Sequence, residues 1–92
     1  MGTVSSRLQR RVARDFPQPG SAEEVMRLLA DASECERVQA AIVFAATGDL
    51  SELKREVELA AIDWRDVLMN GDLAGDDWQS VLDSELGPAR TS

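Results

Sequence analysis

Residues 40–46 read Ala-Ala-Ile-Val-Phe-Ala-Ala, an uninterrupted apolar run that decides the fold. A run of this length fits either a buried strand or a buried helix. Its four alanines favour a helix, because alanine has the highest intrinsic helix propensity. The upstream Ser33-x-x-Glu36 has the pattern of a capping box, which opens helices. We therefore expect a central, buried helix that runs to about Thr47 and is ended by Gly48.

The segments before this run repeat apolar residues every three to four positions, which predicts amphipathic helices. A first helix is expected over about residues 3–15, stopped by Phe-Pro-Gln-Pro-Gly at residues 16–20, because proline lacks the amide hydrogen that a helix needs. A second capping box, Ser21-x-x-Glu24, is expected to open a helix that ends at about Ala32.

The segment after the run begins with Asp49-x-x-Glu52, which also has the pattern of a helix start. Its apolar stripe stays in phase for two further turns beyond residue 60. The helix is therefore expected either to continue to about Met69 or to restart at Asp63 after a bend. Asn-Gly at residues 70–71 has no alternating strand pattern beside it, so we expect a helix C-terminus there rather than a hairpin turn.

The phrase Asp-Trp-x-x-Val-Leu occurs twice, at residues 63–68 and 77–82, and contains both tryptophans of the chain. Aspartate is a strong helix N-cap, and Trp, Val and Leu at i, i+3 and i+4 share one helix face. Each copy predicts a capped helix start with its tryptophan packed inward. We expect Trp64, Trp78 and Phe44 to be structural anchors, whereas an exposed tryptophan would indicate an interface hot spot.

The fold class predicted from these patterns is all-α, a compact bundle of four to five short helices in a single domain over residues 1–92. Residues 1–16 form a basic amphipathic N-terminal helix. Residues 21–86 form an acidic helical body whose last helix ends at about Leu86. Residues 87–92 form a frayed tail after that helix.

Charge is unevenly distributed along the chain. The net charge is −7, but the first 14 residues hold four arginines and no acid, so the other 78 residues carry −11. On a helix these arginines form a stripe beside an apolar stripe. We predict that they contact an acidic protein partner or a second copy of the chain. The alternatives are a solvated face, an anionic membrane surface, or docking onto the protein's own acids. The four residues are Arg7, Arg10, Arg11 and Arg14.

Composition disfavours several classes of function. A net charge of −7 disfavours direct nucleic acid binding, which needs clustered basic residues. No apolar stretch reaches the roughly 18 residues of a membrane span, and the first 14 residues lack the apolar core of a secretory signal. The single cysteine allows no internal disulfide, which suits a reducing compartment. We expect a cytoplasmic protein with no membrane span.

The sequence contains few residue patterns that are typical of catalytic or metal-binding sites. The chain has no histidine, so Cys35 lacks a base to activate it and no zinc cluster is possible. Carboxylate pairs such as Asp63 and Asp66 do acid–base chemistry only inside a suitable cleft. No calcium-loop pattern and no glycine-rich phosphate loop is present. We expect no metal, no cofactor and no enzymatic activity.

From Val38 onward, several short stretches are similar to a known group of sequences. They include Gly-Asp-Leu at 48–50, Asp-Trp-Arg-Asp-Val-Leu at 63–68 and Asp-Trp at 77–78. On these residues the chain resembles a family of short acidic helical proteins of actinobacteria to which no function is assigned. The resemblance covers about half of the chain and implies a bacterial, helical protein, without implying an activity or a ligand.

Three functions remain open at this level. The leading hypothesis is a non-enzymatic protein–protein interaction module or self-associating helical module, which an exposed apolar patch beside the arginines would favour. An acidic mimic of nucleic acid, which regulates a DNA-binding protein, would show a continuous carboxylate-lined face. A small carboxylate-dependent enzyme would show a deep pocket that holds two inward carboxylates.

Overall fold

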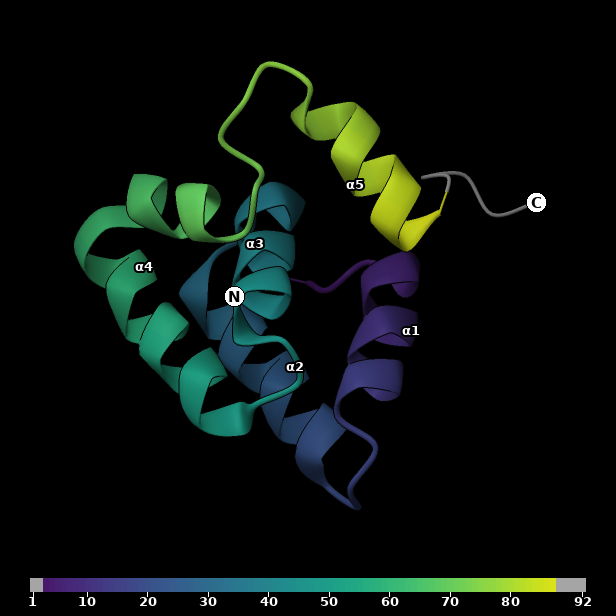
Figure 1. Ribbon diagram of the computed structural model, residues 1–92. Coiled ribbons are helices and arrows are strands. Elements are labelled where there is room, and N and C mark those ends of the chain that lie inside the picture. The colour runs from purple at the N-terminus through teal and green to yellow at the C-terminus, as the bar shows by residue number, and fades with distance from the viewer. Residues whose placement is uncertain (1–2, 88–92) are drawn as a thin grey trace.

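The computed structural model describes residues 3–87, which fold into five helices without a strand (Figure 1). The prediction of an all-α bundle of four to five helices is therefore confirmed. Residues 88–92, which hold most of the expected frayed tail, lie outside the described residues. The helices are α1 (Ser6–Asp15), α2 (Ser21–Ala32), α3 (Glu36–Ala46), α4 (Leu50–Asn70) and α5 (Trp78–Leu86).

Helix α3 lies in the middle of the molecule, between α4 on one side and α1 on the other (Figure 1). Every residue from Val38 to Val43 is buried, and so is Ala46, which confirms that the apolar run is a helix in the core. Its small side chains let a neighbouring segment approach closely. A Cβ added at Gly71, just after α4, would lie 2.5 Å from the carbonyl oxygen of Ala41. Only glycine therefore fits where the end of α4 meets α3.

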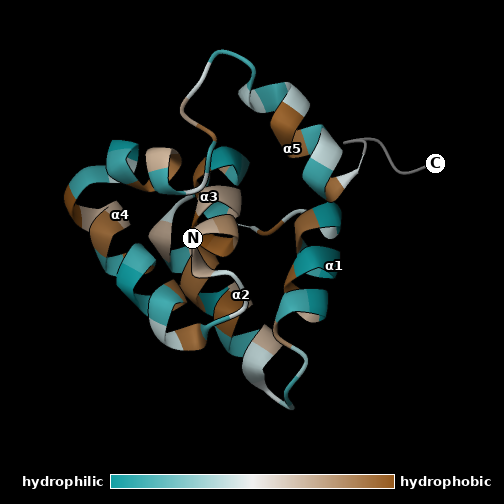
Figure 2. Ribbon diagram, in the orientation of Figure 1, coloured by the Kyte–Doolittle hydropathy of each residue, from teal (hydrophilic) through white to brown (hydrophobic). Residues whose placement is uncertain are grey.

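The other helices turn their apolar faces toward α3 and their polar faces outward (Figure 2). In α1 the stripe of Leu8 and Val12 is fully buried, and Phe16 continues it just beyond the helix. Each such buried side chain contributes roughly 1.5–3 kcal/mol relative to exposure. Within residues 3–87, no helix combines the length and apolar character that a bilayer crossing requires.

Two predicted helix starts are wrong in their capping residue. Helix α2 begins after Gly20, which takes the N-cap position with a left-handed φ of 81°, so Ser21 is the first helical residue and not the cap. Helix α3 begins after Cys35, two residues later than the Ser33 box predicts. The Ser33 hydroxyl instead accepts from the Cys35 amide at 3.0 Å. Its box cannot close because the Glu36 carboxylate is bound to Arg7.

The predicted start of α4 is confirmed. The Asp49 carboxylate accepts hydrogen bonds from the amides of Ser51 and Glu52, at 2.8 and 3.3 Å, and so satisfies two amides of the first turn. The turn before it uses two residues in the left-handed region, Thr47 as the C-cap of α3 and Gly48. Glycine tolerates this conformation freely, whereas threonine adopts it at a cost.

Helix α4 bends at Asp63, where φ is −152° and ψ is 95°, so the alternative of a restart is confirmed and that of an unbroken helix is wrong. The Asp63 carboxylate accepts from the Arg65 amide at 3.1 Å and starts the second segment, residues 64–70. The bend carries this segment back across α3 (Figure 1). As a result, Asn70 donates a hydrogen bond to the Glu56 carboxylate at 3.0 Å.

Helix α5 lies at the edge of the bundle beside α1, after an irregular connector (Figure 1). Leu73 in this connector is fully buried, and the residues from Ala74 to Asp77 are exposed. Asp77 occupies the N-cap position as the repeated phrase predicts, but its side chain makes no capping hydrogen bond within the described residues. Gly87, with a φ of 86°, ends the helix near the position expected.

Candidate functional site

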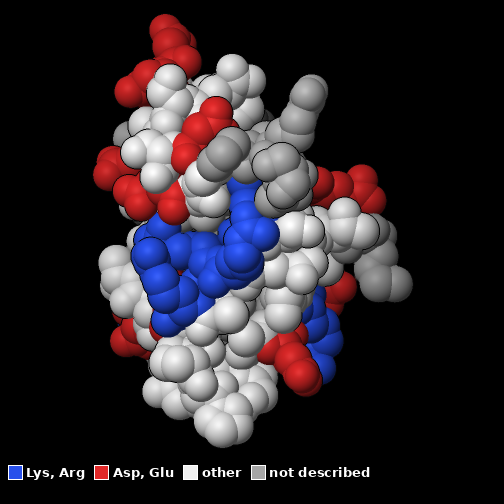
Figure 3. Space-filling model, turned by 90° about the vertical axis from the view of Figure 1, so that its right-hand side faces the viewer, with Lys and Arg blue, Asp and Glu red and all other residues white. Residues whose placement is uncertain are grey.

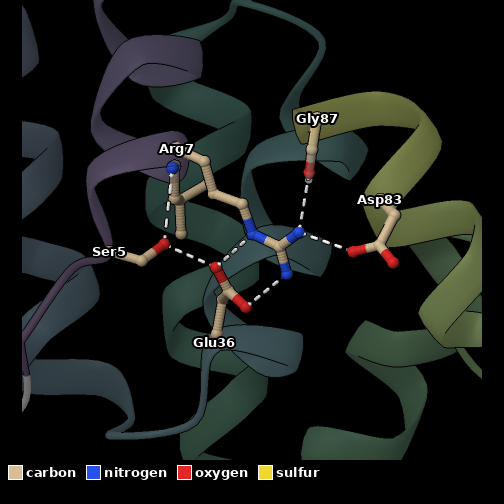
Figure 4. Close-up of polar contacts among 6 residues, drawn as sticks. Ser5, Arg7, Glu36, Asp83 and Gly87 are labelled. Atoms are coloured by element: carbon tan, nitrogen blue, oxygen red, sulfur yellow. Dashed lines mark hydrogen bonds and ion pairs between the residues drawn. The ribbon is translucent and has the colours of Figure 1, made fainter. Parts of the chain in front are cut away.

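Arg7 is buried, with 6% of its surface exposed, and it joins three helices (Figure 4). Its Nε and Nη2 donate to the two carboxylate oxygens of Glu36 at 2.8 and 2.7 Å, which is a bidentate pair. Its Nη1 donates to Asp83 Oδ1 at 2.6 Å and to the Gly87 carbonyl at 2.8 Å. The Ser5 hydroxyl also donates to Glu36. This cluster ties the start of α1 to the start of α3 and the end of α5.

The cluster shifts the protonation equilibria of both ion-pair partners. Hydrogen bonds from Arg7 are the main cause that lowers the pKa of Glu36, and burial of the carboxylate opposes them. The same pair raises the pKa of Arg7. Both groups are therefore charged at neutral pH, and both oxygens of the Glu36 carboxylate accept hydrogen bonds from Arg7.

Two further arginines hold α5 and the connector before it. Arg11 pairs with Asp15 at 2.9 Å and reaches Glu85 of α5 at 3.3 Å. Arg37 of α3 donates to the Leu73 carbonyl at 2.8 Å, and its guanidinium lies 4.6 Å from the centre of the Trp78 ring. We name Arg7, Arg11 and Arg37 the arginine cradle. Its members come from two helices and bind one acidic helix.

The arginine stripe thus divides into two pairs. Arg7 and Arg11 dock onto the protein's own acids, which is one of the alternatives open from the sequence, and Arg7 is too buried to meet a partner in this state. Arg10 and Arg14 are exposed, although Arg14 also pairs with Asp15 at 3.4 Å. Basic side chains gather in a patch on this face, with acidic side chains beside it, so the face is not a continuous carboxylate surface (Figure 3). The expected partner contact stays a prediction for Arg10 and Arg14.

Trp64 departs most from its expected position. It is 52% exposed rather than packed inward, although Val67 and Leu68 of the same phrase are buried. The restart at Asp63 sets a new helical phase in which these two residues face the core. The Arg65 guanidinium lies 6.0 Å from the centre of the Trp64 ring.

An apolar groove of about 310 Å³ lies beside Trp64. Ala60 and Trp64 form its α4 side, and the opposite side comes from the end of α2, the connector that follows and the first turns of α3. We name it the Trp64 groove. Its lining residues are Ala32, Ser33, Cys35, Val38, Ala60 and Trp64. Two other large apolar side chains of α4, Ile62 at 83% and Met69 at 65%, are also exposed.

Trp78 and Phe44, the other two expected anchors, are half-buried and pack against the core. Each lies under an arginine. The Arg11 guanidinium is 4.9 Å from the centre of the Phe44 ring, and Arg37 covers Trp78. Such cation–π contacts add roughly 0.5–1 kcal/mol at partly exposed sites.

Of the carboxylates considered for catalysis, Asp63 caps the second segment of α4 and Asp66 is exposed on that segment. Cys35 is exposed at the N-cap of α3. A pocket of about 380 Å³ beside Arg7 contains the carboxylates of Glu36 and Asp83, but both are bound to Arg7. Within residues 3–87, no three His, Cys, Asp or Glu side chains are placed to hold a metal ion.

Sequence reasoning missed Arg37 as a member of the cradle, and it missed that Glu36 and Asp83 are the acidic partners of Arg7. Glu36 lies 29 residues from Arg7 and Asp83 lies 76 residues away, so no local pattern connects them. It also missed Gln39, which is fully buried and donates to the Ser33 carbonyl at 2.6 Å and to the Leu29 carbonyl at 3.3 Å.

Comparison with known proteins assigns no family. No protein-family model matches the sequence, and no curated protein and no solved structure matches it. The resemblance to actinobacterial proteins therefore stays a prediction. Two surfaces remain as candidate sites, the arginine cradle and the Trp64 groove.

Proposed function

We propose that the protein is a non-enzymatic helical module that binds another protein through the Trp64 groove. The observation that carries the proposal is the position of Trp64, which is 52% exposed at the wall of an apolar groove. Tryptophan is enriched among the residues that dominate binding energy at protein interfaces. Covering Trp64 with an apolar partner surface would remove this area from water at roughly 25 cal/mol per Å².

The shape and charge around the groove indicate the chemistry of the partner. A volume of about 310 Å³ accommodates a large apolar side chain inserted between α3 and α4. Asp31, which directly precedes the lining residue Ala32, is an exposed carboxylate. Arg65 is already paired with Asp63 at 3.6 Å. The partner we propose therefore presents an apolar anchor flanked by Lys or Arg.

The exposed apolar surface lies on α4, across the bundle from the α1 arginines (Figure 1). The sequence hypothesis placed the contact at the arginine stripe, whereas the proposal places it at Trp64. Arg10 and Arg14 are outside the proposed contact. They serve as an internal comparison for the experiment.

The test is affinity capture from cells that encode the protein, with tagged full-length chains and mass spectrometry. We expect a bound protein that the wild type and Ile62→Ala capture and that Trp64→Ala loses. Ile62 is the matched control because it is exposed but does not line the groove. Circular dichroism confirms that each variant is folded. Arg10→Ser is a second control, because Arg10 lies outside the proposed contact. The proposal is wrong if no captured protein depends on Trp64, or if the two control variants lose the captured protein as fully as Trp64→Ala does.

A further inference from the structure

We infer that the arginine cradle is a binding site for acidic amphipathic helices, that α5 occupies it within the chain, and that an acidic helix of another protein replaces α5 when α5 opens. This inference concerns a different surface from the Trp64 groove and goes beyond the proposed function.

The contacts of α5 define what the cradle recognises. Arg7 donates to the Asp83 carboxylate at 2.6 Å and to the Gly87 carbonyl at 2.8 Å, and Arg11 reaches the Glu85 carboxylate at 3.3 Å. Helix α5 carries acids and no basic residue. Its recognised features are thus two carboxylates two positions apart and a helix C-terminus.

The apolar side of the same helix supplies the second half of the recognition. Trp78, Leu82 and Leu86 are spaced four residues apart and therefore lie on one face of α5. Leu82 and Leu86 are buried, and Trp78 is half-buried under Arg37. A ligand of the cradle must combine this apolar stripe with the acidic residues beside it.

Several features allow α5 to open from its place at the edge of the bundle. It has nine residues, which is too short to be stable without packing, and no side chain caps its start within the described residues. A pocket of about 380 Å³, lined on one side by Trp78, Gln79 and Leu82 and on the other by Arg7, leaves the contact with the body incompletely packed. Segments with few buried contacts open at a lower free energy than the whole domain.

Opening of α5 would create a basic, partly apolar site. Arg7 would keep its bidentate pair with Glu36 but lose Asp83 and Gly87, and Arg11 would lose Glu85. Arg10 and Arg14 are already exposed on the same helix and add positive charge. Charge complementarity then selects an acidic helix.

The connector favours another protein over a second copy as the source of that helix. Buried Leu73 and its hydrogen bond to Arg37 fix the first half of the connector. Only residues 74–77 remain free to extend, and at roughly 3.3–3.6 Å per residue they span about 14 Å. This reach keeps α5 close to its own cradle and hinders exchange with a second molecule.

The test measures binding of a synthetic, fluorescein-labelled peptide with the sequence of residues 76–87 to the full-length chain by anisotropy. The chain is used as the wild type and as the double variant Asp83→Asn, Glu85→Gln, which weakens only the hold on its own α5. The apparent affinity scales with the fraction of chains whose cradle is open. We expect the peptide to bind the double variant about tenfold more tightly than the wild type.

The matched control is a peptide that carries the same two substitutions, which should lose most of the binding. Salt at about 0.5 M should also weaken the binding of the unchanged peptide, because the contacts are ionic and partly exposed. Equal affinity for the two chains, or equal binding of the two peptides, would overturn the inference. Light scattering tests whether a dimer forms whose fraction rises with protein concentration. Such a dimer would mean that α5 of a second copy occupies the cradle, and it would overturn the inference that the helix comes from another protein.

Discussion

The two copies of Asp-Trp-x-x-Val-Leu share one local pattern but differ in capping and in the exposure of their tryptophan. At residues 63–68 the aspartate caps the helix segment and the tryptophan is 52% exposed. At residues 77–82 the aspartate makes no capping bond within the described residues, and the tryptophan is half-buried under Arg37. The local pattern therefore places a helix start, whereas distant residues decide whether the tryptophan is an anchor or a contact surface.

The surroundings of the two copies explain the difference. Trp64 lies where α4 has just bent away, and the arginine beside its ring is its own neighbour Arg65, which is itself exposed. Trp78 meets Arg37, a residue of the central helix whose position is fixed by a hydrogen bond to the Leu73 carbonyl. An arginine fixed by the core covers the Trp78 ring, whereas the exposed Arg65 leaves the Trp64 ring open to solvent.

The largest effect is expected from a substitution at Gly71, which lies in the segment between the two copies. A Cβ at this position would lie 2.5 Å from the Ala41 carbonyl oxygen and 2.6 Å from the Ala41 Cα, so backbone must move. We expect Gly71→Ala to lower the free energy of unfolding by about 3 kcal/mol, as overpacking of a core does. Urea denaturation, monitored by circular dichroism, measures this change in the free energy of unfolding.

The matched control for this prediction is Gly75→Ala in the same connector. A Cβ there would meet the flexible side chain of Asp77 and not backbone. A change within about 0.5 kcal/mol is expected for it. Equal losses for the two variants would contradict the claim that Gly71 is required for close packing against α3.

The next largest effect is expected from removing the charge of Glu36, which weakens the contacts that hold α5 and its Trp78. We expect Glu36→Gln to cost about 2 kcal/mol at neutral pH, because Arg7 loses its bidentate, charge-assisted partner. Emission from Trp78 should then shift toward that of an exposed tryptophan, since Arg7 also holds α5.

This stabilisation has a defined pH dependence. The pKa of Glu36 is lower in the folded protein than its ordinary value of 4.5, so folding favours the ionised form. The contribution is fully present above pH 4.5 and is lost as the pH falls through the folded pKa. The stability difference between wild type and Glu36→Gln should therefore shrink as the pH falls below 4.5. A difference that stays constant to pH 2 would show that the charge of Glu36 is not its cause.

The smallest expected effect is the difference in stability loss between the two tryptophan variants. We expect Trp78→Ala to cost about 2 kcal/mol of stability, because a half-buried ring that packs against the core is removed. Trp64→Ala should cost only about 0.5 kcal/mol, as is usual for exposed side chains. Thermal denaturation of the two variants in parallel measures the difference. A larger loss for Trp64→Ala would mean that Trp64, not Trp78, is the anchor.

The sequence predicted those parts of the structure that depend on neighbouring residues. The apolar run of α3 and the Asp49 cap follow from propensity and capping, whereas the sequence left the restart at Asp63 open beside an unbroken helix. The Ser33 box failed because Glu36 is bound by an arginine 29 residues away. The burial of Arg7 and the exposure of Trp64 were equally out of reach, because each depends on how separate helices pack and not on the local pattern.

The most direct test of the contrast between the two copies is the fluorescence of the two single-tryptophan chains, Trp78→Phe and Trp64→Phe. We expect long-wavelength emission, readily quenched by acrylamide, from Trp64 in the first chain. We expect shorter-wavelength emission that is more protected from acrylamide from Trp78 in the second chain. Blue-shifted, protected emission from both tryptophans would show that Trp64 is buried and would contradict the groove as a site of protein contact.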